Sequence, residues 1–589
     1  MIRGRLIICT ALLLTLQGCT SRSSRTILTP AIHGSSVQEA APVGPPAAAS
    51  DLFRDVASEA GLNFRWGHGG RSPLTIIETL GHGTAFLDYD QDGLLDILLV
   101  GNRRLALYHN LGHGHFEETT RDAGLTAEGD FYGVAVGDYD NDSFPDLYIT
   151  GYGKCILYHN LCGNRHGRLA APGMGRANAQ TPKLFEDVTA RAGVGTRGPY
   201  DCVTAAAFVD LDGDGKLDLI AGRYILYTPQ SIKFCMYQGV QAGCGVKNYD
   251  PDWPQVFRNN GNGTFSNRTR EWGFHKAHGR CLGLAVRAAE SGNGAAIYMA
   301  NDELPGDLFV PRGKSYTNIG VQSGTAYNKD GLTQGGMGAD WGDFLNEGKP
   351  GLIVTTFQSE PDSLYRGEGK DLYREYGSTL NIAAGTTAWV GWTAKFLDYD
   401  NDGWLDLVIA NGHSQDNAKQ VEADRSYAQP LMLYHNEAGN VFKDVGAEAG
   451  MEFRRPFVGR GGSIGDFDND GRVDMLMVDE EGPPRLLHNE SHADNHWLGI
   501  RLVGVRCNRD GIGARVTVTA GGKTTMRDQQ LAGGYLSAHD PRLHFGLGNA
   551  RRIDKITVRW PDGHIDNIAG APVDRYVQIT EGRGLSERF

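Results

Sequence analysis

Residues 86–100 read FLDYDQDGLLDILLV, an apolar segment that four carboxylates interrupt. Asp88, Asp90, Asp92 and Asp96 repel one another near neutral pH, so the folded chain must supply a counter-charge. The same DxDxDGxxD pattern returns in an equally apolar frame, as DYDNDSFPD at 138–146, DLDGDGKLD at 210–218, DYDNDGWLD at 398–406 and DFDNDGRVD at 466–474. Such repetition indicates a modular structure whose units share one chemical role.

Two further segments keep the apolar frame but lose most of the acids: RAAESGNGAAIYMA at 287–300 and DFLNEGKPGLIV at 343–354. A second signal, FxDVxxxAG, alternates with the first. It begins clearly at Phe53, Phe116, Phe185 and Phe442, and more weakly at Phe265, Tyr316 and Tyr373. Both signals therefore indicate seven units.

Each unit offers four short β-type runs separated by turn residues. Seven such units in series predict an all-β fold, a seven-bladed β-propeller over residues 51–490. An FxDV strand precedes the first acidic loop and none follows the last one, so the strand near Phe53 is expected to complete the seventh blade. Beyond it, residues 495–582 alternate apolar and polar side chains between glycine turns, which predicts a small antiparallel β domain.

The acidic loops have the donor chemistry of a Ca²⁺ site. Calcium takes six to eight oxygens, and acids at positions 1, 3, 5 and 9 of a tight loop can converge on one ion. Glycine at position 6 permits the turn, although Ser143 replaces it in the second loop. Bare Asp-rich turns are the alternative. About five Ca²⁺ would bring the formal charge of −13 to about −3. The predicted ligands are Asp88, Asp90, Asp92, Asp96, Asp138, Asp140, Asp142, Asp146, Asp210, Asp212, Asp214, Asp218, Asp398, Asp400, Asp402, Asp406, Asp466, Asp468, Asp470 and Asp474.

The N-terminus carries export signals. Arg3 and Arg5 precede an apolar run at 6–16, which is short for a membrane span, and LQGC ends at Cys19. This resembles a bacterial lipoprotein signal peptide over residues 1–19, with lipidation of Cys19; an ordinary secretory signal is the alternative. Residues 20–50 are rich in Ser, Ala and Pro and are predicted to be a flexible tether. We therefore expect an exported, membrane-anchored lipoprotein, periplasmic or at the cell surface.

Export also permits disulfides, and short spacings suggest Cys155 with Cys162 and Cys235 with Cys244. Metal thiolate sites are the competing interpretation, but the sequence has no CxxC pair. The acidic net charge argues against nucleic acid as a partner, because such binding needs a basic face.

The segments GTAFLDYD, LYHNLGHGHFEETT and VFRNNGNGTF resemble FG-GAP and VCBS-like repeats of integrin-type propellers. The region 495–581, with NHWLGIRLVGVRCNRDGIGARVTVTAGG and ITVRWPDGHIDNI, is similar to the ASPIC/UnbV domain. Together they resemble the cartilage acidic protein family and its bacterial exported relatives. That resemblance implies calcium binding and an extracytoplasmic setting, and it carries over no biochemical activity.

No GxSxG, HExxH or P-loop motif is present. The first hypothesis is a calcium-stabilised, surface-anchored binding or adhesion module that recognises a glycan or an extracellular protein. The alternative is an extracytoplasmic hydrolase, lyase or biosynthetic tailoring enzyme. Long connections at 227–254 and 411–430 join second to third strands, so they are expected on the face opposite the acidic loops. The candidate partner-binding residues there are Phe234, Tyr237, Tyr249, Trp253 and His413.

Overall fold

The computed structural model describes residues 51–68, 72–162, 183–292, 294–492 and 494–586. The expected signal peptide, Cys19 and the tether lie outside these residues. From Asp51 onward the chain forms one compact unit. Among the described residues, no helix has the length and apolarity needed to cross a membrane.

Seven sets of four antiparallel strands form the blades of a propeller in the described chain. Each first strand contacts the first strand of the next blade, and β28 of the last blade contacts β2 of the first, so the ring closes. Blades one to four comprise β2 (Thr84–Leu87), β3 (Asp96–Gly101), β4 (Arg104–Asn110) and β5 (Phe116–Glu118); β6 (Asp130–Gly137), β7 (Asp146–Tyr152), β8 (Ile156–Asn160) and β9 (Phe185–Asp187); β10 (Val203–Val209), β11 (Asp218–Arg223), β14 (Gln255–Asn259) and β15 (Phe265–Asn267); and β16 (Cys281–Ala288), β17 (Ala295–Asn301), β18 (Asp307–Arg312) and β19 (Ser315–Asn318).

The remaining blades follow the same order until the last one. Blades five to seven comprise β20 (Ala339–Gly342), β21 (Gly351–Val354), β22 (Ser363–Gly369) and β23 (Leu372–Glu375); β24 (Gly391–Leu397), β25 (Asp406–Gly412), β26 (Ala428–Asn436) and β27 (Phe442–Asp444); and β28 (Gly459–Gly465), β29 (Asp474–Asp479), β30 (Arg485–Asn489) and β1 (Phe53–Asp55). In the seventh blade Phe53 of β1 pairs with Asn489 of β30. The N-terminal strand thus completes this blade, as predicted.

Short helices follow outer strands or lie in connections. They are α1 (Thr120–Ala123), α2 (Thr189–Ala192), α3 (Gly320–Ser323), α4 (Ile382–Thr386), α5 (Ala418–Val421), α6 (Gly446–Ala449) and α7 (Met451–Arg454). A separate hairpin, β12 (Phe234–Tyr237) and β13 (Val240–Gly243), lies in the connection between β11 and β14.

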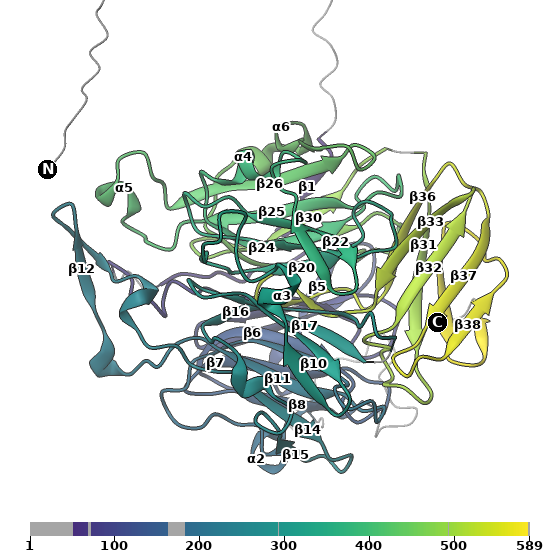
Figure 1. The fold of residues 1–589 in the computed structure, drawn as a ribbon, viewed down its shortest axis with the longest axis horizontal. Helices are drawn as coiled ribbons and strands as arrows, with labels where there is room; N and C mark the ends of the chain where they lie inside the picture. Colours follow the sequence, from purple (N-terminus) through teal and green to yellow (C-terminus); the bar gives the residue numbers. More distant parts are fainter. Residues whose placement is uncertain (1–50, 69–71, 163–182, 293, 493, 587–589) are drawn as a thin grey trace, which may run out of the picture. The chain divides into compact units, whose positions relative to one another are not determined.

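The C-terminal region forms two four-stranded sheets in the orders β36-β31-β39-β40 and β33-β32-β37-β38. Their shared core contains Leu498, Val516 and Trp560. The pairing is antiparallel except between β31 and β39, which are parallel. Figure 1 shows these strands in yellow on the side of the propeller away from β12 and α5. The strands are β31 (His496–Val503), β32 (Arg515–Ala520), β33 (Lys523–Asp528), β34 (Ala532–Gly533), β35 (Ser537–Ala538), β36 (Leu543–Gly548), β37 (Ile553–Arg559), β38 (Ile565–Ile568), β39 (Tyr576–Thr580) and β40 (Gly584–Ser586).

One hairpin of this region, β34–β35, fills the centre of the propeller. Ala538 pairs with Ala85 of β2, and the hairpin joins the sheet of the first blade. A Cβ at Gly83 would lie 1.9 Å from the carbonyl oxygen of Leu536, so only glycine permits this approach. The hairpin contacts the first strands β2, β6, β10, β16, β20 and β28. The C-terminal region is therefore part of the propeller core as well as a domain that follows it.

Candidate functional site

The DxDxDGxxD segments are the connections between first and second strands, here called acidic loops one, two, three, six and seven after their blades. The glycine at position 6 has a left-handed backbone throughout, with φ of 88° at Gly93 and 90° at Gly403. Ser143 adopts φ 86° at the same position. The second loop therefore keeps the common path even though it lacks the glycine.

Backbone N–H groups donate to at least three of the four carboxylates in every acidic loop, those at positions 1, 5 and 9. In the first loop Asp88 accepts hydrogen bonds from the N–H groups of Asp92 (3.1 Å) and Gly93 (3.2 Å). Asp96 is fully buried and accepts from the N–H groups of Tyr89 (3.1 Å) and Asn110 (2.8 Å). Burial raises the pKa of Asp96 to about 7. Position 9 therefore holds the loop in shape, in addition to the ligand role that the sequence suggested.

In four of the loops a histidine on the third strand lies beside the acids, and none of these histidines was among the predicted site residues. His109 Nδ1 lies 3.0 Å from Asp96 Oδ1, which raises the pKa of His109 to about 9. The protonated imidazole is thus one source of the counter-charge that the acids need. The signal was present in the sequence as LYHN at 107–110, 157–160 and 433–436 and LLHN at 486–489. Each of these histidines belongs to a group of three residues whose potential metal-ligand atoms lie within 4.8 Å of one another. The groups are Asp90, Asp92 and His109; Asp140, Asp146 and His159; Asp400, Asp402 and His435; and Asp468, Asp470 and His488.

The third loop differs because Arg258 stands at the histidine position, in VFRN at 256–259. Its Nε lies 2.5 Å from Asp212, and its Nη2 lies 2.7 Å from Asp214. Lys216 adds a second contact to Asp214 at 3.1 Å. Arginine and lysine side chains therefore pair with the carboxylates at positions 3 and 5 of this loop, where the other four loops have a histidine.

The four histidine-bearing loops do fit a divalent cation. In loop six Asp398 is only 2% exposed, and among the described residues its Oδ1 has no hydrogen-bond partner. In loop one Asp90 Oδ1 is likewise buried without a partner in the described chain. An unpaired buried carboxylate oxygen is unfavourable unless a cation contacts it. Carboxylate oxygens are also the ligands that hard dications prefer.

The loops are also joined to one another through position 4, a second feature that the sequence analysis missed. The amide of Asn141 donates to the carbonyl oxygen of Gly215 (3.0 Å), and Asn401 donates to Gly471 (2.9 Å). The amide of Asn469 in loop seven donates to the carbonyl oxygen of Gly93 in loop one (3.0 Å). Each bond links position 4 of one loop to position 6 of the next blade. The recurring Asn or Gln after the second acid was the available signal.

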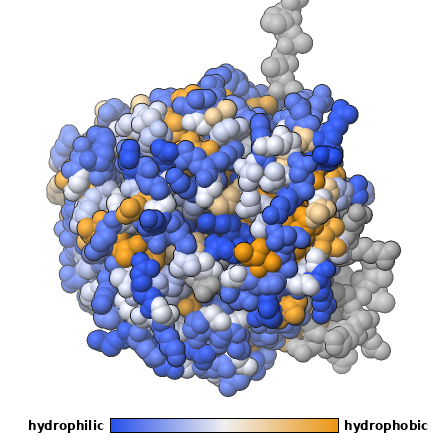
Figure 2. All heavy atoms as spheres, turned by 45° about the vertical axis from the view of Figure 1, so that its right-hand side comes forward, coloured by the Kyte–Doolittle hydropathy of each residue, from blue (hydrophilic) through white to orange (hydrophobic). Residues whose placement is uncertain are grey.

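The C-terminal region covers part of the acidic-loop face. The Tyr576 hydroxyl donates to Asp466 Oδ2 (2.6 Å), and the N–H group of Asp138 donates to Asp510 (2.8 Å). Arg501 lies 4.0 Å from Asp88. Figure 2 turns the side of the C-terminal strands toward the viewer and shows a mainly hydrophilic surface with apolar residues in small patches. The acidic loops and the C-terminal region thus share one interface.

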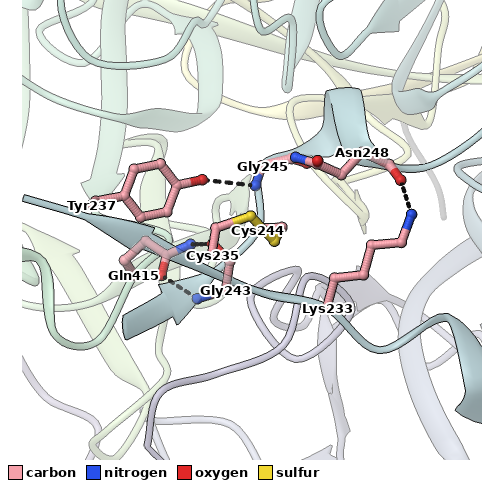
Figure 3. Close-up of a disulfide and its surroundings, with 8 residues drawn as sticks. All are labelled: Lys233, Cys235, Tyr237, Gly243, Cys244, Gly245, Asn248 and Gln415. Atoms are coloured by element: carbon pink, nitrogen blue, oxygen red, sulfur yellow. Dashed lines mark hydrogen bonds between the residues drawn. A yellow bond between two sulfur atoms is a disulfide. The ribbon is translucent and has the colours of Figure 1, made fainter. Parts of the chain in front are cut away.

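The two long connections reach each other at the other end of the channel, here called the channel mouth. Residues 224–254 join β11 to β14, and residues 413–427 join β25 to β26. The side-chain amide of Gln415 accepts from the Gly243 N–H (3.1 Å) and donates to the Gly243 carbonyl oxygen (3.0 Å), as Figure 3 shows. Asn417 donates to the carbonyl oxygen of Gln241 (2.8 Å). The predicted Cys235–Cys244 disulfide forms beside this contact.

The predicted second disulfide is wrong. Cys155 and Cys162 are both buried and are not bonded to each other. Strand β8 separates them, and an extended strand rises about 3.3 Å per residue, so the two thiols lie at opposite ends of the strand.

The five candidate partner residues divide into two groups. Phe234, Tyr237 and Trp253 are 39%, 38% and 46% exposed, as a contact surface requires. Tyr249 is only 4% exposed and packs against Tyr227, so the prediction that it contacts a partner is wrong. His413 is also buried, but it lines a cavity.

That cavity lies at the channel mouth and has a volume of about 330 Å³. Its walls include Tyr224, Trp392, Phe357, Met337, His413 and Asp302. Residues from both long connections line it, among them Tyr237 and Gln415. Burial lowers the pKa of His413 to about 4, so its imidazole is neutral near pH 7.

Comparison with known proteins agrees with the repeat pattern. The family described as FG-GAP-like repeat matches residues 88–149 and 398–477, and the family described as ASPIC and UnbV matches residues 504–586. Cartilage acidic protein 1 of Xenopus tropicalis is 26% identical over 311 residues, which cover 51% of this chain and 44% of that protein. The protein of the same name from Homo sapiens is 26% identical over 310 residues, covering 50% and 43%. The match thus spans less than half the length of either curated relative.

Solved structures align with lower sequence identity than these relatives. A lectin of Agrocybe aegerita that recognises non-reducing terminal N-acetylglucosamine aligns with a TM-score of 0.37 and 13% identity, covering 68% of this chain and 87% of the lectin chain. The WD40 β-propeller domain of Doa1 aligns with a TM-score of 0.35 and 11% identity, covering 73% and 97%. The chain therefore carries FG-GAP-like repeats and an ASPIC and UnbV domain, and it is similar to cartilage acidic protein 1 over about half of its length.

Proposed function

We propose that this protein is a calcium-binding, extracytoplasmic binding or adhesion module whose partner, a glycan or an extracellular protein, docks at the channel mouth. One observation carries the proposal: the long connections of blades three and six meet through Gln415 and Gly243 and enclose a cavity. Connections this long in a compact fold are usually functional. The exposed rings of Phe234, Tyr237 and Trp253 supply rigid contact area beside the cavity.

Calcium has a structural role in this proposal. We assign it to acidic loops one, two, six and seven, where carboxylate oxygens converge and a histidine neutralises the ion-free loop. The third loop is left out because Arg258 binds its acids. The ions would stiffen the face on which the C-terminal region packs, at the end of the propeller opposite the channel mouth.

The proposed location is the outer side of a membrane, with an acyl anchor at Cys19. A Cys19→Ser variant should then leave the membrane fraction, because the lipid can no longer be attached. Retention of the variant in that fraction, with normal processing, would exclude the anchor.

The docking surface is tested with glycan arrays and secreted-protein screens on the calcium-loaded chain. Phe234→Ala and Tyr237→Ala should each weaken binding of any hit, and replacement of residues 232–250 by a short Gly/Ser linker should abolish it. Leu372→Ala, which truncates a side chain of similar exposure (49%) on β23, serves as the matched control. Binding that survives the linker replacement would place the site elsewhere.

The enzyme alternative is favoured by two carboxyl groups near the cavity. Burial raises the pKa of Asp302 to about 6 and that of Glu360 to about 7, values suited to proton transfer near neutral pH. Product analysis of every bound ligand separates a hydrolase, lyase or tailoring enzyme from a binding module.

A further inference from the structure

Two carboxylates at the channel mouth flank the same glycine. Asp302 follows β17 and forms an isolated β-bridge with Gly335. The N–H group of Gly335 donates to Glu360 Oε2 at 2.9 Å. A Cβ on Gly335 would lie 3.2 Å from Asp302 Oδ1. Blades four and five thus bring two acids together beside the cavity, of which Asp302 is a wall.

These two carboxylates lack a cation. Asp302 accepts a hydrogen bond from the Tyr224 hydroxyl (2.6 Å), and Glu360 accepts from the backbone of Gly335 (2.9 Å) and of Phe357. Within the described chain neither one forms an ion pair. Burial raises the pKa of both groups, and repulsion from neighbouring acids, including Glu303, adds to it. A negative charge on either carboxylate therefore has no ion-pair partner in the described chain, although the charges of Arg280 and Lys247 act to lower the pKa of Asp302.

The other two acids that line the cavity are paired. Glu303 contacts Lys247 at 2.8 Å, and Glu422 contacts Arg425 at 2.7 Å. Among the acids of the cavity wall, Asp302 is thus the one without an ion pair in the described chain. A ligand that brings a positive charge would remove an unfavourable feature of the ligand-free protein.

The rest of the lining combines aromatic and apolar residues with polar ones. Its one arginine, Arg425, pairs with Glu422, and one face of Trp392 is already covered by the guanidinium of Arg460, 4.2 Å from the ring centroid. Tyr224, Trp392 and Phe357 line it together with Leu282 and Met337. His413 is neutral, and its Nδ1 accepts the N–H group of Gln415 (2.9 Å). Aromatic faces attract ammonium groups. A volume of about 330 Å³ lies at the small end of ligand pockets, about 300–1,000 Å³.

We propose that the channel-mouth cavity binds a small organic cation, with a protonated amine against Asp302, Glu360 adding negative charge from behind the wall, and the apolar part of the ligand against Tyr224, Trp392 and Phe357. This inference rests on the proposed function, since it names the chemical class recognised at that site. An amino sugar and the amine of a lysine side chain share this chemistry.

The test is calorimetric titration of the full, calcium-loaded chain with matched probes. Glucosamine and N-acetylglucosamine form one pair, and N-α-acetyl-lysine amide and N-α-acetyl-norleucine amide form the other, so each pair compares an amine with a neutral analogue. We expect the amine of at least one pair to bind about tenfold or more tightly than its analogue, because hydrogen bonds to charged groups contribute about 1.5–3 kcal/mol. The pair that responds identifies the source of the amine.

Asp302→Asn and Glu360→Gln should each weaken amine binding about tenfold or more. Their melting temperatures should not fall, because neither substitution leaves a cation unpaired. Asp330→Asn, at an exposed acid in the connection before β20, is the control. Equal binding of amine and neutral analogue in both pairs, or unchanged affinity in both variants, would overturn the inference. Loss of one Ca²⁺ per chain in both variants would also overturn it, since the acids would then hold a metal.

The cation site and the docking surface can be refuted separately. A neutral glycan or protein that binds, and that Tyr237→Ala weakens while Asp302→Asn does not, would refute the cation site and leave the docking surface standing. Binding that is indifferent to every channel-mouth variant would refute both.

Discussion

The hydroxyl of Tyr535 donates a hydrogen bond of 2.9 Å to the carbonyl oxygen of Leu80. Tyr535 belongs to the β34–β35 hairpin of the C-terminal region, whereas Leu80 precedes the first strand of the first blade. The Tyr535 ring also meets Trp392 edge to face, with centroids 4.9 Å apart. One residue of the C-terminal region therefore contacts both the segment before blade one and a strand of blade six at the centre of the ring.

Loss of that ring should destabilise the whole propeller. Tyr535→Ala is expected to lower the free energy of unfolding by about 3–5 kcal/mol, the usual range for a large buried aromatic side chain. Tyr535→Phe removes only the hydrogen bond and should lower it by about 1 kcal/mol. Thermal and urea unfolding measure both variants. If both substitutions lower the free energy of unfolding by the same small amount, the β34–β35 hairpin contributes little to the stability of the propeller.

Arg258→His should give the third loop the donor set of the other four. The guanidinium that contacts Asp212 and Asp214 is removed, and the imidazole arrives at the position of His109. Bound calcium should rise by one ion per chain, measured by elemental analysis of dialysed protein. Arg191→His, at an exposed arginine of the preceding blade, is the control. An unchanged count would mean that Arg258 is not what excludes the ion.

The hydrogen bonds between acidic loops should contribute to stability, and they can be removed without changing a predicted calcium ligand. Asn401→Ala removes the donor to Gly471 and leaves a buried carbonyl oxygen with one partner fewer. The free energy of unfolding should fall by about 1–3 kcal/mol. Asn262→Ala, at an exposed turn, should have little effect. If both substitutions act alike, the inter-loop bond does not contribute.

Glu581 predicts a specific pH dependence. Burial alone would raise its pKa, but the N–H groups of Val505, Arg506 and Cys507 outweigh burial and hold the pKa at about 2. A folded pKa below the unfolded value of about 4.3 gives stability that is complete above pH 4.3 and is lost as the pH falls toward 2. At pH 7 this contribution is about 3 kcal/mol.

Glu581→Gln should remove that contribution. The variant should be less stable than the wild type at pH 7, and the difference should shrink between pH 5 and pH 3. Unfolding curves at each pH measure it. A difference that stays constant across this range would contradict the assignment.

Local patterns were enough to predict much of this fold. The spacing of the DxDxDG and FxDV signals predicted seven blades and the pairing of Phe53 with the last blade, because each signal marks one strand and one turn. The side of the long connections followed from strand alternation. Position-4 amides and third-strand histidines were visible as repeated letters, but their partners lie in other strands or other blades.

Other features depend on contacts that no local pattern encodes. LAGGYLSAHD, residues 531–540, has the composition of a turn, yet it supplies the centre of the ring because Gly83 and Gly133 leave room for Leu536. Short spacing suggested a bond between Cys155 and Cys162, but a strand lies between them. The carboxylates Asp302 and Glu360 come from two blades and become neighbours only when blade five packs against blade four.

The central claim is that the acidic loops are ion sites, and calcium content tests it most directly. Purified chain, dialysed against buffer with micromolar Ca²⁺, should contain four ions per chain, one for each histidine-bearing loop. A chelator should lower the melting temperature, because the ions bind only the folded loops. Two or fewer ions per chain, with a melting temperature indifferent to chelator, would show that the loops are bare turns held by their own hydrogen bonds.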